Sequence, residues 1–242
     1  MGRLVSASLG AALLACLVAC SDWPRRGAEG GDAEAQYNLA VMYEKGGRSV
    51  PQDYVEAARW YRAAADQGFG PAQYNLGSLY ADGTGVPQDF QEAMRWYRQA
   101  ADKGLPEAQH DLGTLYDRGE GTARDPVEAA KWYRLAAEKG VVDAQFNLAL
   151  LCLSGDGVPR DEAEASGWFR KAADKGDNGA QVRLAMLYDE GKGVEHNPVM
   201  AYLWANRAAN NGDEDGRKLR DRVVAGMTED QLSEARKLAL DW

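Results

Sequence analysis

The stretch AQYNLGSLYADGTGVPQDFQEAMRWYRQAADKG, residues 72–104, decides the fold, because related copies of it occupy most of the chain. One tryptophan in each copy returns every 36 residues, and the series comprises Trp60, Trp96, Trp132, Trp168 and Trp204. A strict period in this range is typical of a solenoid, in which supersecondary units stack on one another. The repeat therefore predicts the architecture before any single element is considered.

The second half of each copy predicts one helix. An alanine stands three residues before each tryptophan and another four residues after it, and a glycine stands eight residues after it. These offsets lie on one face of a helix that ends at the glycine, with small alanines beside a large ring. A helix-capping side chain begins each such segment, at Asp53, Asp89, Asp125, Asp161 and Asn197.

The first half of each copy predicts a second helix. Its text is AQYNLGSLY at residues 72–80, and related text stands at 35–43, 108–116, 144–152 and 180–188. Leucine and tyrosine four residues apart, with a small residue between them, form an apolar stripe with a notch for close contact. The segment Gly83-Thr84-Gly85-Val86-Pro87 then breaks the helical pattern and allows a sharp reversal.

This pattern resembles the Sel1-like repeats, which are α/α relatives of the tetratricopeptide repeats. The resemblance implies an all-α fold, an α/α superhelical solenoid of five Sel1-like helical hairpins with a C-terminal capping helix. The repeats are expected at about 32–68, 69–104, 105–140, 141–176 and 177–212. Two positions depart from the pattern: Cys152 replaces a tyrosine and Ala205 replaces the second aromatic residue of the fifth repeat.

The N-terminus predicts a targeting segment. Residues 4–19 carry no charge, and Leu17-Val18-Ala19-Cys20 resembles the lipobox of a bacterial lipoprotein. That resemblance implies a signal peptide at 1–19, acylation of Cys20, and a periplasmic protein anchored in the outer membrane, with the inner membrane as the alternative. An ordinary secretory peptide or a short anchor is the other interpretation. Residues 20–31 are expected to be a polar tether.

The C-terminal segment, residues 213–242, breaks the repeat. Thr228-Glu229-Asp230-Gln231 is a capping box that opens a helix. The apolar spacing of Leu232, Ala235 and Leu238 predicts that this helix covers the fifth repeat, because solenoids need capped ends for solubility.

Composition argues against several classes of function. The formal net charge of −9 disfavours nucleic-acid binding and favours a basic protein partner, although an acidic surface also serves solubility. The chain has two histidines, and after loss of Cys16 and acylation of Cys20 it would retain one free thiol, at Cys152. We therefore expect no metal, no cofactor and no disulfide.

No catalytic motif is present, which predicts a non-enzymatic protein. The alternative is an envelope hydrolase acting on cell-wall or β-lactam substrates, since some Sel1-like relatives are described as penicillin-binding or β-lactamase-like. That hypothesis needs a nucleophile and a base in reach of each other, and its candidates are Cys152 and His110. We interpret Cys152 as a core residue and the tryptophans as core rather than as a carbohydrate site.

The binding face is predicted from the tetratricopeptide analogy, in which first helices line the concave side. Positions facing it vary among repeats, whereas core positions agree. The first column is Tyr37, Tyr74, His110, Phe146 and Val182; the second is Val41, Ser78, Thr114, Leu150 and Met186; the third is Glu44, Ala81, Asp117, Leu153 and Asp189. These residues suit a peptide or loop with basic and apolar groups. Packing against the adjacent hairpin is the competing interpretation.

The resemblance leaves two roles for a partner-binding lipoprotein. One is a scaffold or regulator of envelope assembly or signalling. The other is an immunity protein, because Sel1-like lipoproteins guard the periplasm against phospholipase effectors of the type VI secretion system.

Overall fold

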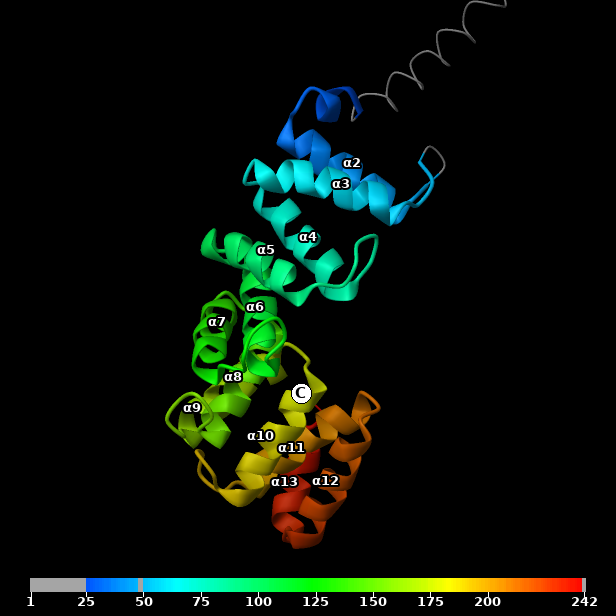
Figure 1. The fold of residues 1–242 in the computed structure, drawn as a ribbon. Coiled ribbons are helices and arrows are strands. Elements are labelled where there is room, and N and C mark those ends of the chain that lie inside the picture. The colour runs from blue at the N-terminus through cyan, green and yellow to red at the C-terminus, as the bar shows by residue number, and fades with distance from the viewer. Residues whose placement is uncertain (1–24, 48–49, 241–242) are drawn as a thin grey trace, which may run out of the picture. The chain divides into compact units, whose positions relative to one another are not determined.

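The computed structural model describes residues 25–47 and 50–240, and every regular element in these residues is a helix (Figure 1). Each repeat contributes a first and a second helix. The five pairs are α2 (Ala33–Lys45) with α3 (Tyr54–Asp66), α4 (Gly70–Asp82) with α5 (Phe90–Asp102), α6 (Pro106–Arg118) with α7 (Pro126–Glu138), α8 (Val142–Ser154) with α9 (Glu162–Asp174), and α10 (Asn178–Glu190) with α11 (Pro198–Asn210). Two further helices follow, α12 (Glu214–Gly226) and α13 (Glu229–Leu238). The prediction of an all-α fold built from consecutive helical hairpins is confirmed.

The chain divides into two compact units. The first comprises residues up to Ala108 together with 120–122, and the second comprises 109–119 and everything from Ala123 onward. The described part of the first unit therefore holds α2 to α5 and the first turn of α6. The second unit holds the rest of α6 and the helices from α7 to α13.

The predicted caps begin the second helices. The Asp89 carboxylate accepts hydrogen bonds from the backbone N–H groups of Gln91 at 2.9 Å and Glu92 at 3.1 Å. Asp53 and Asp125 also accept from two N–H groups, whereas Asp161 and Asn197 each accept from one, that of the residue three positions later. Because these side chains satisfy N–H groups that have no partner within the helix, the start of each second helix is set by one residue.

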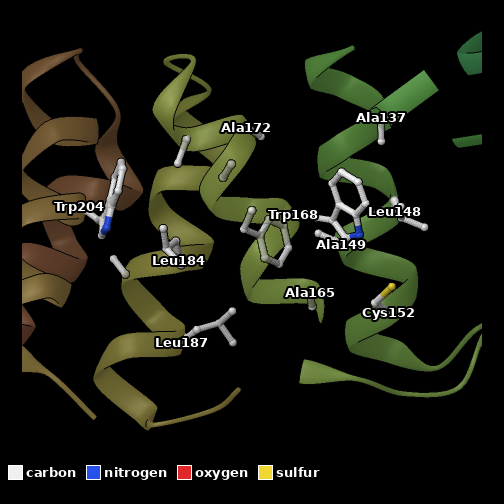
Figure 2. Close-up of a cluster of buried hydrophobic side chains, with 14 of the residues drawn as sticks. Ala137, Leu148, Ala149, Cys152, Ala165, Trp168, Ala172, Leu184, Leu187 and Trp204 are labelled. Carbon is white, nitrogen blue, oxygen red and sulfur yellow. The ribbon is translucent and has the colours of Figure 1, made fainter. Parts of the chain in front are cut away.

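The core consists of the repeated alanines and leucines. All ten alanines of the two columns beside the tryptophans are 0% exposed. Of the tryptophans, Trp96, Trp168 and Trp204 are buried, whereas Trp60 and Trp132 are half-buried. Figure 2 shows Trp168 and Trp204 among alanines and leucines of the second unit. The core interpretation is thus confirmed for three tryptophans, and the other two border the core.

The notch between leucine and tyrosine has the predicted purpose. A Cβ added to Gly77 would lie 2.7 Å from the ring of Tyr97, and one added to Gly113 would lie 2.8 Å from the ring of Tyr133. A side chain at either glycine would therefore push the two helices of the hairpin apart.

A glutamine column that the sequence did not explain joins consecutive repeats. Gln73, Gln145 and Gln181 are buried, and each donates from Nε2 to a backbone carbonyl eight residues earlier. For Gln145 the acceptor is the Ala137 oxygen, at 3.0 Å. In each case the accepting carbonyl lies near the end of the second helix of the preceding repeat, so this bond fixes how one hairpin packs against the next.

The C-terminus differs from the prediction, because it contains two helices rather than one. The capping box at Thr228 is present and opens α13. However, α12 precedes it and packs against both α10 and α11, and Figure 1 shows α12 and α13 beside α11. On α13, Ala235 is buried and Leu232 half-buried, but Leu238 is 41% exposed, so the prediction that Leu238 is buried is wrong. The end of the solenoid is covered instead by α12, which buries the apolar side chains of Leu219 and Val223.

Helix α12 keeps the 36-residue period. Asp213 caps it by accepting from the Gly216 N–H at 2.7 Å, as Asp177 caps α10 by accepting from Ala180. Gly216 occupies the position of Ala180 in the repeat, and a Cβ there would lie 2.6 Å from the Cβ of Ala208. Segment 213–240 therefore continues the repeat with a degenerate hairpin.

Residues 25–31, expected to belong to the tether, pack against the first repeat. Residues 25–29 are helical and Ala28 is 1% exposed. Gln36 donates to the Ala28 oxygen at 3.1 Å, which is the bond that Gln73 makes to Ala65 one repeat later. Residues 25–31 thus have the form of the end of a second helix.

Candidate functional site

The predicted face of the first unit is held by contacts within each hairpin. The Tyr37 ring lies 5.7 Å from that of Tyr61, and the Tyr74 ring lies 5.7 Å from that of Tyr97. The Tyr97 hydroxyl donates to Ser78 Oγ at 3.2 Å. These predicted residues are half-buried, so each presents one side while its hairpin partner fixes its rotamer.

Glu44, at the third predicted position of the first repeat, accepts a hydrogen bond from the Tyr61 hydroxyl. Burial, and secondarily the Glu44 carboxylate, raise the pKa of Tyr61 well above its ordinary value of 10.0. Tyr61 therefore stays protonated and donates to Glu44 at every physiological pH.

In the second unit, an acidic hollow of about 360 Å³ gathers three of the predicted residues of α6, which are His110, Thr114 and Asp117. Its other lining residues are Arg118, Tyr133, Asp143, Phe146, Asn147 and Asp177. Three carboxylates and one guanidinium border this acidic hollow, so it attracts cations.

His110 is fixed at the wall of the acidic hollow. Its Nδ1 lies 2.9 Å from Asp111 Oδ1, and its Nε2 lies 3.3 Å from the Asn147 amide nitrogen. Because an amide nitrogen only donates, Nε2 accepts and Nδ1–H donates to Asp111. The ring lies 5.7 Å from that of Tyr133. Burial raises the pKa of Tyr133 to about 12, so its hydroxyl stays neutral.

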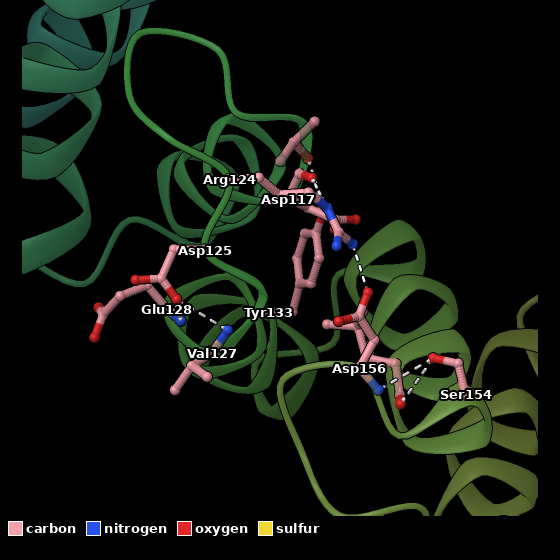
Figure 3. A network of polar contacts seen from close by, with 10 residues as sticks. Asp117, Arg124, Asp125, Val127, Glu128, Tyr133, Ser154 and Asp156 are labelled. Carbon is pink, nitrogen blue, oxygen red and sulfur yellow. Dashed lines mark hydrogen bonds and ion pairs between the residues drawn. The ribbon is translucent and has the colours of Figure 1, made fainter.

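Asp117 belongs to a polar network (Figure 3). The Arg124 guanidinium donates to Asp117 Oδ1 at 2.8 Å and to Asp156 Oδ2 at 2.6 Å. It also donates from Nε to the Asp117 backbone oxygen at 2.7 Å. One arginine in the loop before α7 thus joins two successive repeats and holds a predicted binding residue.

A second hollow, of about 550 Å³, adjoins the acidic one, because Phe146 lines both. We call it the basic hollow. Its apolar residues are Phe146, Val182, Met186 and Leu219; its charged residues are Arg183, Lys218, Arg222, Asp213 and Asp215. Val182 and Met186 are thereby brought beside Phe146. Half of this lining comes from α12 and Asp213, and neither this helix nor its cap was predicted from the sequence.

Three other predicted residues of the second unit, Leu150, Leu153 and Asp189, are not part of the lining of either hollow. Leu150 and Leu153 are half-buried against the core cluster. Asp189 accepts from Arg222 at 3.1 Å, at the border of the basic hollow. For the two leucines, the competing interpretation of packing within the solenoid describes the contacts better.

The geometry gives no support to the hydrolase alternative. Cys152 is 0% exposed, and burial raises the pKa of its thiol to about 11. Its polar neighbour is Glu164, whereas the nitrogens of His110 are taken by Asp111 and Asn147. A protonated, enclosed thiol is a poor nucleophile. Within the described residues, no three side chains of the His, Cys, Asp or Glu types are grouped for a metal ion.

The predicted signal peptide and Cys20 lie outside the described residues. Among the helices that the structure does describe, none combines the length and apolar character needed to cross a bilayer.

Comparison with known proteins agrees with the repeat. A model of the Sel1 repeat matches residues 33–69, 70–105, 106–141, 142–177 and 179–213. A Sel1 repeat protein from Oxalobacter formigenes is 36% identical, with a TM-score of 0.73 over 78% of this chain and 77% of that protein. Among curated proteins, none is significantly similar in sequence.

Two further solved structures limit what can be inferred about this chain from its relatives. A protective antigen present in uropathogenic Escherichia coli strains is 38% identical, with a TM-score of 0.82 over 91% of this chain and 48% of the antigen. This chain therefore spans about half the antigen's length. An immunity protein from Pseudomonas aeruginosa is 21% identical, with a TM-score of 0.45 over 86% of this chain and 81% of that protein. At that level of likeness nothing about its role transfers.

Proposed function

Because the chain belongs to the Sel1 repeat family, whose fold is a protein-interaction scaffold, we propose that it binds a protein partner through the face formed by its first helices. The observation that carries the proposal is the convergence of predicted residues in the second unit. His110, Thr114 and Asp117 line one hollow, Val182 and Met186 line the next, and Phe146 lines both.

The contrast between core and face supports this choice. Core columns repeat the same alanines and leucines, because every hairpin must pack against its neighbours. The first-helix columns place tyrosine, histidine, phenylalanine and valine at equivalent positions. Packing does not require this variety, whereas recognition of one partner does.

The side chains are also preorganised. The Phe146 ring lies 5.6 Å from that of Phe169 in an edge-on arrangement, and His110 is fixed by two polar contacts. Because these side chains are already fixed, they would lose little rotamer freedom when a partner binds, which favours affinity.

We further propose that the chain acts in the bacterial envelope, anchored by a lipid at Cys20. The support is the apolar N-terminal segment that ends in the lipobox-like residues 17–20. Metabolic labelling with radioactive palmitate tests this. Label that incorporates equally into the chain and into a Cys20→Ser variant would rule the anchor out.

The partner-binding proposal is tested with the triple variant His110→Ala, Phe146→Ala and Met186→Ala. Envelope proteins captured by the purified chain are quantified by mass spectrometry. The control is Lys131→Ala, Glu138→Ala and Asp174→Ala, three exposed positions on second helices. We expect the first variant to lose its partner and the control to keep it. Equal capture by both, with melting curves showing that both are folded, would refute the proposal.

The immunity and scaffold roles are separated by a toxicity assay. Each gene that neighbours this one is expressed with periplasmic targeting, with and without the chain. Rescue of growth by the chain supports an immunity role. A partner that is harmless when expressed alone supports a scaffold or regulator.

A further inference from the structure

We propose that the first-helix face of the second unit is electrically bipolar and selects a peptide segment that carries a basic group, a central apolar side chain and an acidic group, in that order from α6 to α12. This inference rests on the proposed function and names the chemistry of the partner. It adds an acidic group to the basic and apolar groups that the sequence led us to expect in the partner.

The basic hollow gathers three cations in an acidic protein, beside two carboxylates, of which Asp213 caps α12 and Asp215 is exposed. Arg183, Lys218 and Arg222 gather at its border although the chain carries a net charge of −9. Arg222 is paired with Asp189 at 3.1 Å. Among the described residues, the ion pair of Lys218 is a distant and exposed one, with Asp215 at 4.0 Å. Arg183 has no ion pair within the part of the chain that the structure describes. Two of the three cations can therefore receive a carboxylate from a partner.

The floor of the basic hollow is apolar. Leu219 is 6% exposed and closes one side, while Phe146, Val182 and Met186 are half-buried. Methionine adapts to irregular shapes, so this floor accepts an aliphatic or aromatic side chain. An apolar floor below free cations fits an apolar residue followed by an acidic one, or by a terminal carboxylate.

The adjoining acidic hollow has the opposite preference. Its carboxylates are Asp117, Asp143 and Asp177, and its cation is Arg118. Asp117 is shared with Arg124, and Asp177 caps α10, which leaves Asp143 exposed for a cation of the partner. Because the two hollows meet at Phe146, a peptide that places its apolar side chain there brings opposite charges to opposite sides.

The probes are three fluorescent peptides of equal length. The first has two lysines, a central leucine and two glutamates, separated in that order. The second has the same composition with alternating charges, and the third replaces leucine by glycine. Binding to the purified chain is measured by fluorescence anisotropy at low salt. We expect the first peptide to bind about tenfold more tightly than either of the others.

The double variant Arg183→Glu with Lys218→Glu should abolish this preference, since both side chains are exposed. The control, Arg236→Glu with Lys237→Glu, makes the same charge change at exposed positions of α13. It should keep the preference.

Three results would overturn the inference: equal binding of the first two peptides, an equal loss in the control variant, or no binding of any peptide at about 1 mM. The proposed function survives these results if the triple alanine variant still loses its partner. It fails on its own if that variant keeps the partner.

Discussion

Gly193 and Glu162 stand 31 residues apart in sequence, yet a Cβ at Gly193 would lie 2.0 Å from the backbone oxygen of Glu162. Gly193 is the second glycine of a loop, and Glu162 begins the second helix of the preceding repeat. The same approach occurs between Gly157 and Pro126, whose backbone oxygen would lie 2.4 Å from an added Cβ. The second glycine of the loop therefore serves contact between repeats as well as reversal of the chain.

Gly193→Ala should be strongly destabilising. Its φ of +65° already disfavours a side chain, and the Cβ would meet backbone that cannot move aside. We expect a loss of roughly 3 kcal/mol or more in the free energy of unfolding, measured by urea denaturation. The matched control is Gly212→Ala, at φ +89° with nothing within 4 Å of its Cβ. That change should cost only about 1 kcal/mol. Similar losses at both sites would show that close approach contributes nothing.

The helices were predictable from sequence because their ends depend on single residues. Asp89 accepts two backbone N–H groups, and Gly104 has φ +85°, which a glycine adopts readily. Helix α12 was not predicted because Arg220 stands 36 residues after Leu184, which interrupts the leucine column of the repeat, and the buried leucine stands one position earlier, at Leu219. The signal that could have found it is Asp213, which stands 36 residues after Asp177.

The columns of candidate residues were predictable from the repeat, but their division between two hollows was not. The repeat register places His110, Phe146 and Val182 in one column, and the structure keeps them on the linings of adjoining hollows. Its charge pattern depends on α12, because Lys218 and Arg222 reach the face only through packing of that helix on α10. No local pattern in the sequence records that contact.

Cys152 should react slowly with thiol reagents in the folded protein. In a variant with Cys16→Ser and Cys20→Ser it is the remaining thiol. Burial raises its pKa from 9.0 to about 11, so little thiolate forms near pH 8. We expect release of nitrothiobenzoate from Ellman's reagent to be slow in buffer and rapid in denaturant. Equal rates would place the thiol at the surface.

The same pKa shift makes the protein sensitive to alkali. The folded protein holds the thiol proton more tightly than the unfolded chain, whose cysteine pKa is 9.0. The free energy of unfolding is therefore unaffected below pH 9 and falls as the pH rises toward 11, where the unfolded thiol ionises and the folded thiol does not. The loss is at most about 1.4 kcal/mol per pH unit. Chemical denaturation at pH 8 and pH 10 measures it. A Cys152→Ala variant is less stable at both values, because it leaves a cavity, but its stability should fall less between them.

Residues 25–31 should contribute to the stability of the first unit. A chain that begins at residue 32 loses the Ala28 carbonyl, to which buried Gln36 donates at 3.1 Å. It also exposes the apolar surface that Ala28 covers. We expect unfolding to be easier by about 1 kcal/mol or more than in a chain that begins at residue 25. Equal denaturation midpoints would mean that these residues act as a tether.

The two C-terminal helices should contribute unequally to stability. Helix α12 buries Leu219 and Val223 to 6% and 3% exposure, whereas α13 fully buries Ala235 and leaves Leu238 41% exposed. A chain that ends at residue 226 should therefore stay folded and monomeric, with a modest loss of stability.

A chain that ends at residue 212 also uncovers Ala205 and Ala208, which α12 packs against through Gly216. At about 25 cal/mol per Å2, a few hundred Å2 of newly exposed apolar surface amounts to several kcal/mol, which is comparable with the whole stability of a domain. We expect this shorter chain to aggregate or to fray from its C-terminal end, as seen by light scattering and by hydrogen exchange in α11. If the chain ending at 212 stays monomeric with an unchanged melting temperature, α12 does not cap the repeats, and the basic hollow would lose its structural basis.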